Sequence, residues 1–124
     1  GSLGLSSDDL YDPEANIRAG AEYLRSLLNT FDSVADQNER LQLSLAAYNG
    51  GVGHVFDARA LAEKYGADKN VWAGNVEKYI HLKRLEQYYT DPVCKNGYFR
   101  ADETINYVGN VIARWEYYRE TVPE

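Results

Sequence analysis

The residues best suited to chemistry lie in the segment Tyr48-Asn49-Gly50-Gly51, together with a later tyrosine, Tyr107. A phenol, an amide that both donates and accepts hydrogen bonds, and exposed backbone at a helix end would together suit an acetamido sugar. A simpler interpretation is structural, with Asn49 capping a helix and Tyr48 filling the core. Spacing alone leaves both interpretations open, and the first predicts that Tyr48, Asn49, Gly50 and Tyr107 bind a glycan.

Cleavage of a glycosidic bond would also need a carboxylic acid, and the candidates are Glu77, Glu86 and Glu103. Such an acid needs a pKa raised by a desolvated setting, so that it can protonate a leaving oxygen near neutral pH. Glu77 and Glu86 lie close to lysines and an arginine, Lys83 among them, which predicts a solvated helical face. Glu103 falls in the first turn of a predicted helix, where the helix dipole favours negative charge. None of the three is therefore predicted to be catalytic.

Nucleophilic and metal-dependent chemistries find little support in the sequence. Neither His54 nor His81 has a context that resembles an activated nucleophile, and both are predicted to be surface or packing residues. Cys94 is the only cysteine, so no internal disulfide can form, and its spacing from the histidines does not fit a zinc site. No metal and no cofactor are expected.

Composition limits the chain to a single domain and narrows the class of partner. A length of 124 residues can bury one core, and a hydrophobic fraction of 44% excludes a wholly disordered chain. The net charge of -6 argues against nucleic acid as a partner, since the 13 Lys and Arg residues are scattered. A neutral glycan is compatible with this charge, and 11 Tyr and 2 Trp could line a sugar cleft. No apolar run approaches the roughly 18 to 20 residues that span a bilayer.

Helical spacing of apolar residues recurs along the chain and strand signals are almost absent, which predicts an all-α domain. Asp12-Pro13 is typical of a helix start, and the apolar stripe that follows predicts a helix over residues 13 to 31. Asp36 and Glu39 resemble a capping box for a second helix. The apolar residues of this second helix are distributed around almost its whole circumference, which predicts a central position in the domain.

The ends of the next helices are predicted from glycines, which tolerate positive φ. The second helix is predicted to end at Asn49-Gly50-Gly51, and Gly66 stands just after the end of the third. Asp102 is placed to cap the last helix, after a loop over residues 91 to 101. About five helices are expected in all, the last three over residues 53 to 65, 71 or 75 to 89, and 103 to 120.

Four blocks of the sequence resemble, in the same order, the lytic transglycosylase family of goose-lysozyme-like domains. Over residues 3–124 they are LYDPEANIRAGAEYLRSLL, LAAYNGGVGHVFDARALAEKYG, NVWAGNVEKYI and GYFRADETINYVGNVIARWEYY. Any one block is weakly specific, whereas four in register over most of the chain are strongly so. The resemblance implies a lysozyme-like helical fold and peptidoglycan strands as the partner. Residues 1–2 are predicted to be a cloning remnant outside the domain.

The resemblance also implies roles for individual residues. Tyr48 and Asn49, within the Ala-Tyr-Asn block, match the family's positions beside the scissile sugar, and Tyr107 matches a late tyrosine near the catalytic acid. In the family one glutamate protonates the oxygen between N-acetylmuramic acid and N-acetylglucosamine. The muramic C6 hydroxyl then attacks its own anomeric carbon and leaves a 1,6-anhydro end. Neither a metal nor a cofactor is implied.

The chain departs from the family pattern at its beginning. The family's Glu-Ser pair and Gly-Leu-Met-Gln block precede the region that matches here, and this sequence contains no methionine. We therefore expect residues 3–124 to be the C-terminal portion of the domain, with the catalytic glutamate upstream and no activity in this chain alone. Loss of the catalytic helix is expected to uncover apolar surface on the central helix and favour self-association. The local turn at Ala101, where related sequences often have glycine, is a smaller departure.

Location and two alternative functions follow from the same resemblance. The parent protein is expected in the periplasm or at the outer membrane, attached through upstream segments, because this chain carries no targeting signal. A hydrolytic goose-type muramidase is one alternative, and it would differ in leaving no anhydro ends. A helical module without catalytic activity is the other, either one that binds glycan or one that serves purely structural interactions.

Overall fold

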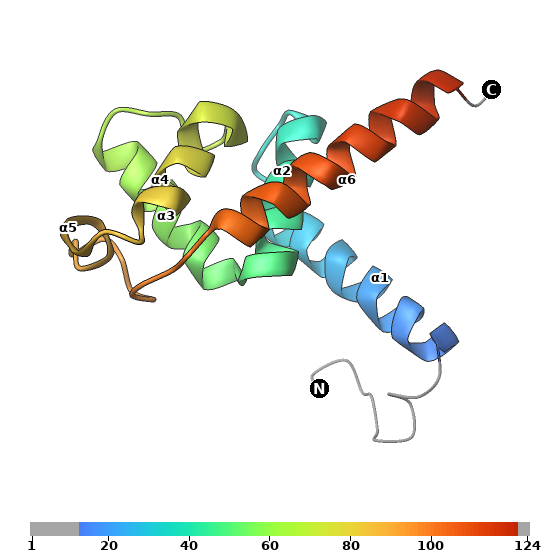
Figure 1. The fold of residues 1–124 in the computed structure, drawn as a ribbon, viewed down its shortest axis with the longest axis horizontal. Coiled ribbons are helices and arrows are strands. Elements are labelled where there is room, and N and C mark those ends of the chain that lie inside the picture. The colour runs from blue at the N-terminus through green and yellow to red at the C-terminus, as the bar shows by residue number, and fades with distance from the viewer. Residues whose placement is uncertain (1–12, 122–124) are drawn as a thin grey trace.

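The computed structural model describes residues 13–121, which contain helices and no strand, so the predicted all-α class is confirmed (Figure 1). The predicted remnant at residues 1–2 and the cap at Asp12 lie outside the described residues. The elements in chain order are α1 Pro13–Thr30, α2 Gln37–Gly50, α3 Val52–Lys64, η2 Trp72–Val76, α4 Glu77–Leu82, α5 Glu86–Tyr89 and α6 Asp102–Thr121.

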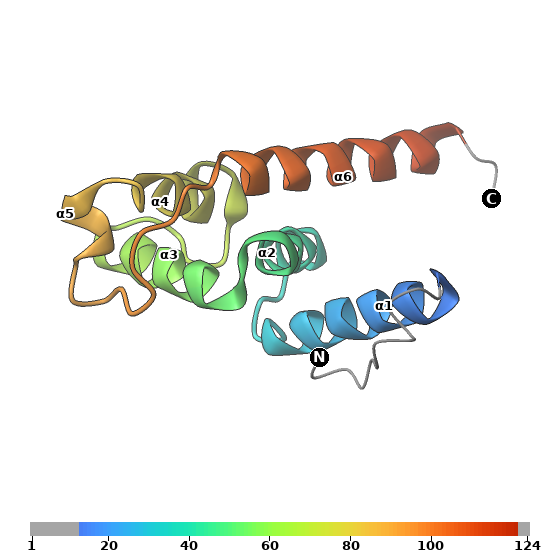
Figure 2. The same cartoon turned by 60° about the horizontal axis from the view of Figure 1, so that its bottom comes forward.

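Helix α2 occupies the centre of the fold, as its apolar circumference predicts. It packs against α1, α3 and α6, and Figure 2 shows it between α1 on one side and α6 on the other. Its residues from Leu43 to Ala47 are buried. The expectation of uncovered apolar surface on this helix is therefore wrong for that stretch, because the neighbouring helices cover it. Exposed apolar side chains occur on α2 only after this stretch, at Tyr48, which is 38% exposed, and the outer helices add Ile17 of α1 at 74% and Trp115 of α6 at 50%.

The ends of α2 are set by the residues that the sequence indicates. The Asp36 carboxylate accepts a hydrogen bond of 3.0 Å from the Glu39 backbone N–H, which confirms Asp36 as the N-cap. The Glu39 side chain does not complete a capping box, because its carboxylate accepts from the Trp72 N–H at 3.0 Å and so ties α2 to η2. At the other end Gly51 has φ of 104° and donates its N–H to the Ala47 carbonyl.

Helix α3 stops at a glycine in the predicted place. Gly66 has φ of 86°, and its N–H donates to the Glu63 carbonyl at 3.4 Å. The Ala67 N–H donates to the Ala62 carbonyl at 2.8 Å. This pair of bonds is a Schellman motif, in which a residue of positive φ satisfies carbonyls that the helix leaves unpaired.

The fourth predicted helix, over residues 71 or 75 to 89, is wrong as a single element. Gly74 has φ of 72°, so η2 is an irregular turn, and α4 then ends at Leu82. Residues 83 to 85 form a turn before α5, since the Lys83 N–H bonds the Ile80 carbonyl. The Lys83 carbonyl accepts from the Phe99 N–H at 3.3 Å, a partner that a continuous helix would exclude. Within residues 13–121, six α-helices and the short element η2 therefore replace the predicted five helices.

The core lies where α2, α3, η2 and α4 meet, while the first half of α1 and the last half of α6 extend beyond it (Figure 2). Over residues 13–121, no helix combines the length and the apolar character needed to cross a bilayer. The largest apolar side chains of the core that are fully buried are Phe31, Leu43, Leu61, Ile80, Val55, Val76 and Val108.

Candidate functional site

Tyr48 of α2 and Tyr107 of α6 line one side of an open hollow of about 440 Å³, and α1 forms the other side. Their rings lie nearly parallel, with an interplanar angle of 11° and centroids 6.4 Å apart. Tyr23 of α1 flanks Tyr48 at 5.6 Å between ring centroids. The hollow is completed by residues of α1, namely Asn16, Ile17, Gly20, Ala21 and Leu24.

Gly20 determines how closely Tyr48 approaches α1. A Cβ atom placed at Gly20 would lie 2.9 Å from the Tyr48 hydroxyl oxygen, which is closer than real Cβ contacts allow. A glycine within a helix normally destabilises it by about 1 kcal/mol relative to alanine. The close approach of the Tyr48 ring gives this glycine a physical reason, and a glycine in mid-helix was the sequence signal for it.

Asn49 and Gly50 meet the first turn of α6. The Thr104 hydroxyl donates a 2.8 Å hydrogen bond to the Asn49 Oδ1 atom. A Cβ atom at Gly50 would lie 2.7 Å from the Phe99 ring and 2.8 Å from the Thr104 hydroxyl, so glycine leaves room for both. Thr104 and Phe99 were not predicted from the sequence, because neither follows a local pattern that points to α2.

The structure does not support the two particular structural roles considered for Asn49 and Tyr48, a helix cap and a core side chain. The C-cap of α2 is Gly51, and the Asn49 side chain contacts Thr104 instead of its own helix end. Tyr48 is 38% exposed and so does not fill the core. Burial, followed by the neighbouring Tyr48 phenol, raises the pKa of Tyr107, so Tyr107 remains a hydrogen-bond donor at neutral pH. Of the four predicted residues, Tyr48 and Tyr107 line the hollow, whereas Asn49 and Gly50 contact the first turn of α6 and do not line it.

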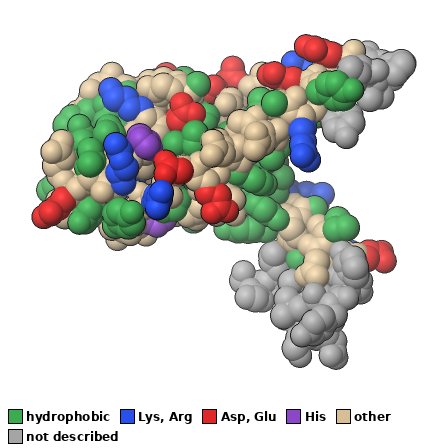
Figure 3. Space-filling view, in the orientation of Figure 1, with side chains coloured by type: hydrophobic (Ala, Val, Ile, Leu, Met, Phe, Trp, Pro, Cys, Tyr) green, Lys and Arg blue, Asp and Glu red, His purple; other side chains and the backbone are tan. Residues whose placement is uncertain are grey.

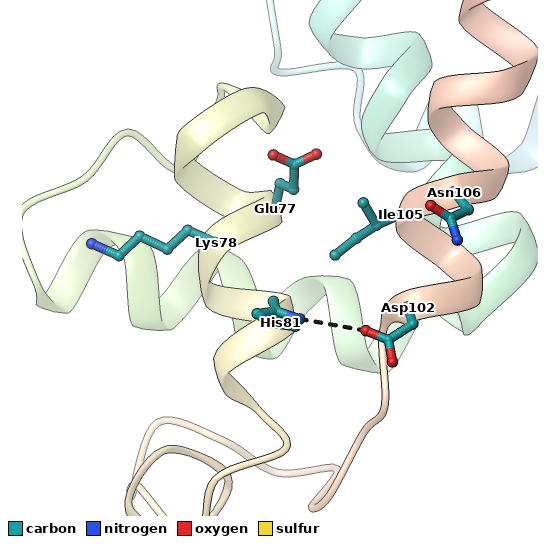
Figure 4. A pocket seen from close by; sticks show the side chains of 6 residues that line it. All are labelled: Glu77, Lys78, His81, Asp102, Ile105 and Asn106. Carbon is teal, nitrogen blue, oxygen red and sulfur yellow. Dashed lines mark ion pairs between the residues drawn. The ribbon is translucent and has the colours of Figure 1, made fainter.

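Among the described residues that line the Tyr48–Tyr107 hollow, none is acidic. Glu77 lines a different hollow, of about 500 Å³ between α4 and α6, with His81 and Asp102 on facing walls (Figure 4). The His81 Nδ1 and Asp102 Oδ1 atoms are 3.8 Å apart there. Acidic, basic and histidine side chains are mixed on this face of the molecule (Figure 3). Glu86 is exposed, as predicted, and Glu103 is exposed in the first turn of α6, where it was predicted to lie.

The described carboxylates whose pKa departs from its ordinary value shift in the direction opposite to that of a general acid. Hydrogen bonds from Lys64, and then from the Val93 N–H, lower the pKa of Asp91 to about 2. The hydrogen bond from Lys69 lowers the pKa of Glu63. A general acid needs the reverse shift, so neither group is suited to protonate a glycosidic oxygen.

A buried charge network lies next to the site, and the sequence did not reveal it. Lys83 is fully buried, which makes the predicted solvated face wrong at this residue. Its ammonium donates to Asp57 Oδ2 at 2.8 Å and lies 2.6 Å from His54 Nδ1. Asp57 also accepts from the backbone N–H groups of Lys95 and Asn96, each at 2.9 Å. The network therefore attaches the segment before α6 to α3.

Histidine and aromatic packing connect this network to the end of α2. The His54 ring stacks on Phe99, with centroids 4.2 Å apart, so of the two roles predicted for His54, surface or packing, it has the packing role. Burial, followed by the Lys83 charge, lowers the pKa of His54, while the Asp57 charge opposes the shift. Burial alone would raise the pKa of Asp57, but hydrogen bonds from Lys83, Lys95 and Asn96 hold it below its ordinary value. Asp57 is therefore ionised at neutral pH.

The fold and the aromatic hollow together define a lysozyme-like helical domain. The family described as Transglycosylase SLT domain matches residues 1–72, and the chain belongs to this family.

Comparison with known proteins gives relatives that share one name, "Membrane-bound lytic murein transglycosylase F". The chain is 40% identical to the protein of Vibrio campbellii over 110 residues, which is 89% of this chain and 20% of the relative. It is 40% identical to that of Photobacterium profundum over 100 residues, 81% of this chain and 19% of the relative. For Shewanella loihica the identity is 38% over 107 residues, 86% of this chain and 22% of the relative. The chain thus spans about a fifth of the length of the curated relatives that it matches.

Proposed function

We propose that this chain forms part of the glycan-binding cleft of a peptidoglycan lytic transglycosylase, and that the Tyr48–Tyr107 hollow contacts the sugar. The observation that carries the proposal is the pair of parallel tyrosine rings that line an open hollow beside α1. Aromatic faces offer apolar area with a polar edge, which matches the mixed surface of a sugar ring. The name shared by the relatives, a murein transglycosylase, supports peptidoglycan as the glycan.

The chemistry that we propose for the parent protein needs one carboxylic acid. It protonates the bridging oxygen as the bond to the anomeric carbon of N-acetylmuramic acid breaks. The carboxylate formed then takes the proton of the C6 hydroxyl, whose oxygen bonds to that anomeric carbon and closes the 1,6-anhydro ring. No acidic residue lines the hollow in the described part of the chain. Because the glutamate of the family precedes the region that this chain resembles, we propose that another part of the parent protein supplies the acid, and we expect this chain alone to be inactive.

The roles of the residues in this chain are binding and orientation. Tyr48 and Tyr107 would pack against a sugar face, and Asn49 would hydrogen-bond an acetamido group. The relatives' name describes them as membrane-bound, so we propose that the parent protein acts in the cell envelope, in the periplasm or at the outer membrane. Segments outside this chain would supply the attachment.

Incubation with purified murein sacculi tests the catalytic part of the proposal. The 124-residue chain should release no anhydromuropeptides, whereas a complete lytic transglycosylase in a parallel reaction should release them. Release of anhydro products by this chain would show that one of its own carboxylates is the acid. Release of products with reducing ends would instead support the goose-type muramidase alternative.

Titration with chitotetraose tests the binding part. Binding should weaken in Tyr107→Ala, which removes a ring that lines the hollow, and in Asn49→Ala, which removes the exposed amide that we propose to contact the sugar. Tyr98→Ala is the matched control, since Tyr98 is 57% exposed and does not line the hollow. Equal affinity in all four proteins, or no binding by the wild type, would contradict a sugar site here and favour a structural helical module.

Self-association is a further proposal, which rests on the exposed apolar side chains of the outer helices, Ile17 and Trp115. Each of these side chains exposes apolar area that contact with a second molecule would bury. Sedimentation velocity should show dimers or larger species whose fraction rises with concentration. A monomer at every concentration would refute this proposal without touching the glycan site.

A further inference from the structure

The contact between Thr104 and Asn49 joins the first turn of α6 to the last turn of α2. Thr104 is only 2% exposed, and its hydroxyl donates to Asn49 Oδ1 at 2.8 Å. The Asn49 side chain is exposed, and within residues 13–121 its Nδ2 group has no hydrogen-bond partner. A primary amide can accept through oxygen and donate through nitrogen, so this contact occupies the accepting end and leaves the donating end available.

We propose that Thr104 is a positioning residue, whose hydroxyl fixes the Asn49 amide with its Nδ2 donor presented to the ligand. This inference rests on the proposed function and specifies the ligand atom that Asn49 recognises. A group that presents only donor hydrogens selects an acceptor oxygen, and in an acetamido sugar the carbonyl oxygen of the acetamido group is the strongest acceptor. Asn49 thus selects the acetyl group through its oxygen and not through its N–H.

The surroundings of Thr104 hold the hydroxyl in place. Gly50 has no side chain, and this lets the Thr104 hydroxyl and the Phe99 ring pack against the end of α2. Phe99 is itself held by the His54 ring, with centroids 4.2 Å apart, and by its N–H bond to the Lys83 carbonyl. A threonine held on this many sides has little rotational freedom to lose when it forms the bond, so the hydrogen bond can orient Asn49 before ligand arrives.

Two substitutions at Thr104 distinguish the effect of its hydroxyl group from the effect of its side-chain shape. Thr104→Val keeps the branched shape and removes the donor, while Thr104→Ser keeps the donor and loses a methyl. Removing one neutral hydrogen bond changes an equilibrium by about three- to tenfold. Chitotetraose should therefore bind Thr104→Val about three- to tenfold more weakly than wild type, and Thr104→Ser should recover most of that loss. A loss shared equally by both variants would overturn the positioning role.

Two further readouts distinguish positioning from mere support of the fold. In ¹⁵N-resolved spectra without ligand, the Asn49 Nδ2 cross-peaks should move to unconstrained side-chain positions in Thr104→Val and stay in place in Thr104→Ser. Partially deacetylated oligosaccharide lacks many acetyl oxygens, so Thr104→Val should weaken its binding less than that of chitotetraose. Unmoved cross-peaks in Thr104→Val, or the same loss for both ligands, would overturn the inference.

A double variant links the effect to Asn49. In an Asn49→Ala background, Thr104→Val should have no additional effect on affinity, because the amide that it positions is gone. Additive losses would show that Thr104 acts on the site by another route and would refute the inference alone. Failure of the wild-type chain to bind chitotetraose would refute the proposed function and the inference with it. Thermal denaturation of each variant checks that it is folded under the binding conditions.

Discussion

Replacement of Asp57 by asparagine should destabilise the domain severely, because it leaves the Lys83 ammonium buried without an opposite charge. The Lys83 side chain is 0% exposed and that of Asp57 is 3% exposed. Removing one partner of a buried ion pair costs about 3 to 5 kcal/mol, since the remaining charge is neither solvated nor paired. A domain's whole free energy of unfolding is about 5 to 15 kcal/mol. Asp57→Asn should therefore remove a large fraction of the free energy of unfolding.

The hydrogen bonds around Asp57 also predict that Asp57→Asn destabilises the fold. The carboxylate accepts from Lys83, from two backbone N–H groups and from the Asn96 side chain, so donors approach both of its oxygens. An asparagine amide would face some of these donors with a donor of its own, whichever way it is turned. The amides of Lys95 and Asn96 should consequently exchange hydrogen faster in the variant.

Urea denaturation followed by far-UV circular dichroism at neutral pH measures the loss. Asp57→Asn combined with Lys83→Met should be more stable than Asp57→Asn alone, because the double variant no longer buries a lone charge. Glu63→Gln, on the same helix but in an exposed pair with Lys69, is the matched control and should keep the wild-type midpoint. An unchanged midpoint for Asp57→Asn, or strictly additive effects in the double variant, would refute the reasoning.

Three more predictions follow from single contacts. On acidification, the melting temperature of His54→Gln should fall less than that of the wild type. Because the pKa of His54 is lower in the folded protein, its contribution to stability is complete above about pH 6.5 and decreases as the pH falls below that value. Gly20→Ala should weaken chitotetraose binding, because its methyl displaces the Tyr48 hydroxyl, yet change stability by no more than about 1 kcal/mol. Gly66→Ala should lower the free energy of unfolding by about 1 to 2 kcal/mol, because φ of 86° strains an alanine. Gly109→Ala should instead raise it by up to about 1 kcal/mol, because the added methyl of this α6 residue meets open space.

Each of these predictions has its own control and its own contrary result. His81→Gln is the matched histidine variant for His54, and identical slopes of melting temperature against pH for wild type and His54→Gln would contradict the first prediction. For Gly20→Ala, the contrary result is wild-type affinity. The pair Gly66 and Gly109 forms an internal control, since alanine at both positions adds the same methyl; equal effects on the urea midpoint would show that φ does not decide the outcome.

Helix ends were predictable from the sequence wherever a local signal fixes them. Asp36 caps α2 because a carboxylate reaches an N–H group only three residues ahead, and Gly51 and Gly66 end helices because their φ is positive. The break after Leu82 was missed for the opposite reason. It depends on a lysine that pairs with Asp57, 26 residues earlier in the chain. The apolar spacing on either side of Lys83 is that of one helix.

The candidate site was predictable in part. Residue types and spacing indicated Tyr48, Asn49 and Tyr107, and the resemblance to a family gave them roles; the structure stacks Tyr48 on Tyr107 and places Asn49 against Thr104. Thr104 was missed because a threonine in the first turn of a helix is ordinary, and its contact with Asn49 spans 55 residues. Such a contact follows from how α6 crosses α2, which no spacing within either helix determines.

The buried pair explains how a chain segment without regular structure can position α6 accurately. Residues 91 to 101 contain no helix, so their own backbone hydrogen bonds cannot set where α6 begins. The Asp57 carboxylate accepts hydrogen bonds from the backbone N–H groups of Lys95 and Asn96, and the Lys83 carbonyl accepts one from the Phe99 N–H. These bonds hold the segment at two points, one on α3 and one on the residue that follows α4. Apolar contacts could cover the same surface, but they would tolerate a slip along it, whereas these hydrogen bonds permit one alignment. The position of α6 against Asn49 therefore depends on charges that do not themselves contact the glycan hollow.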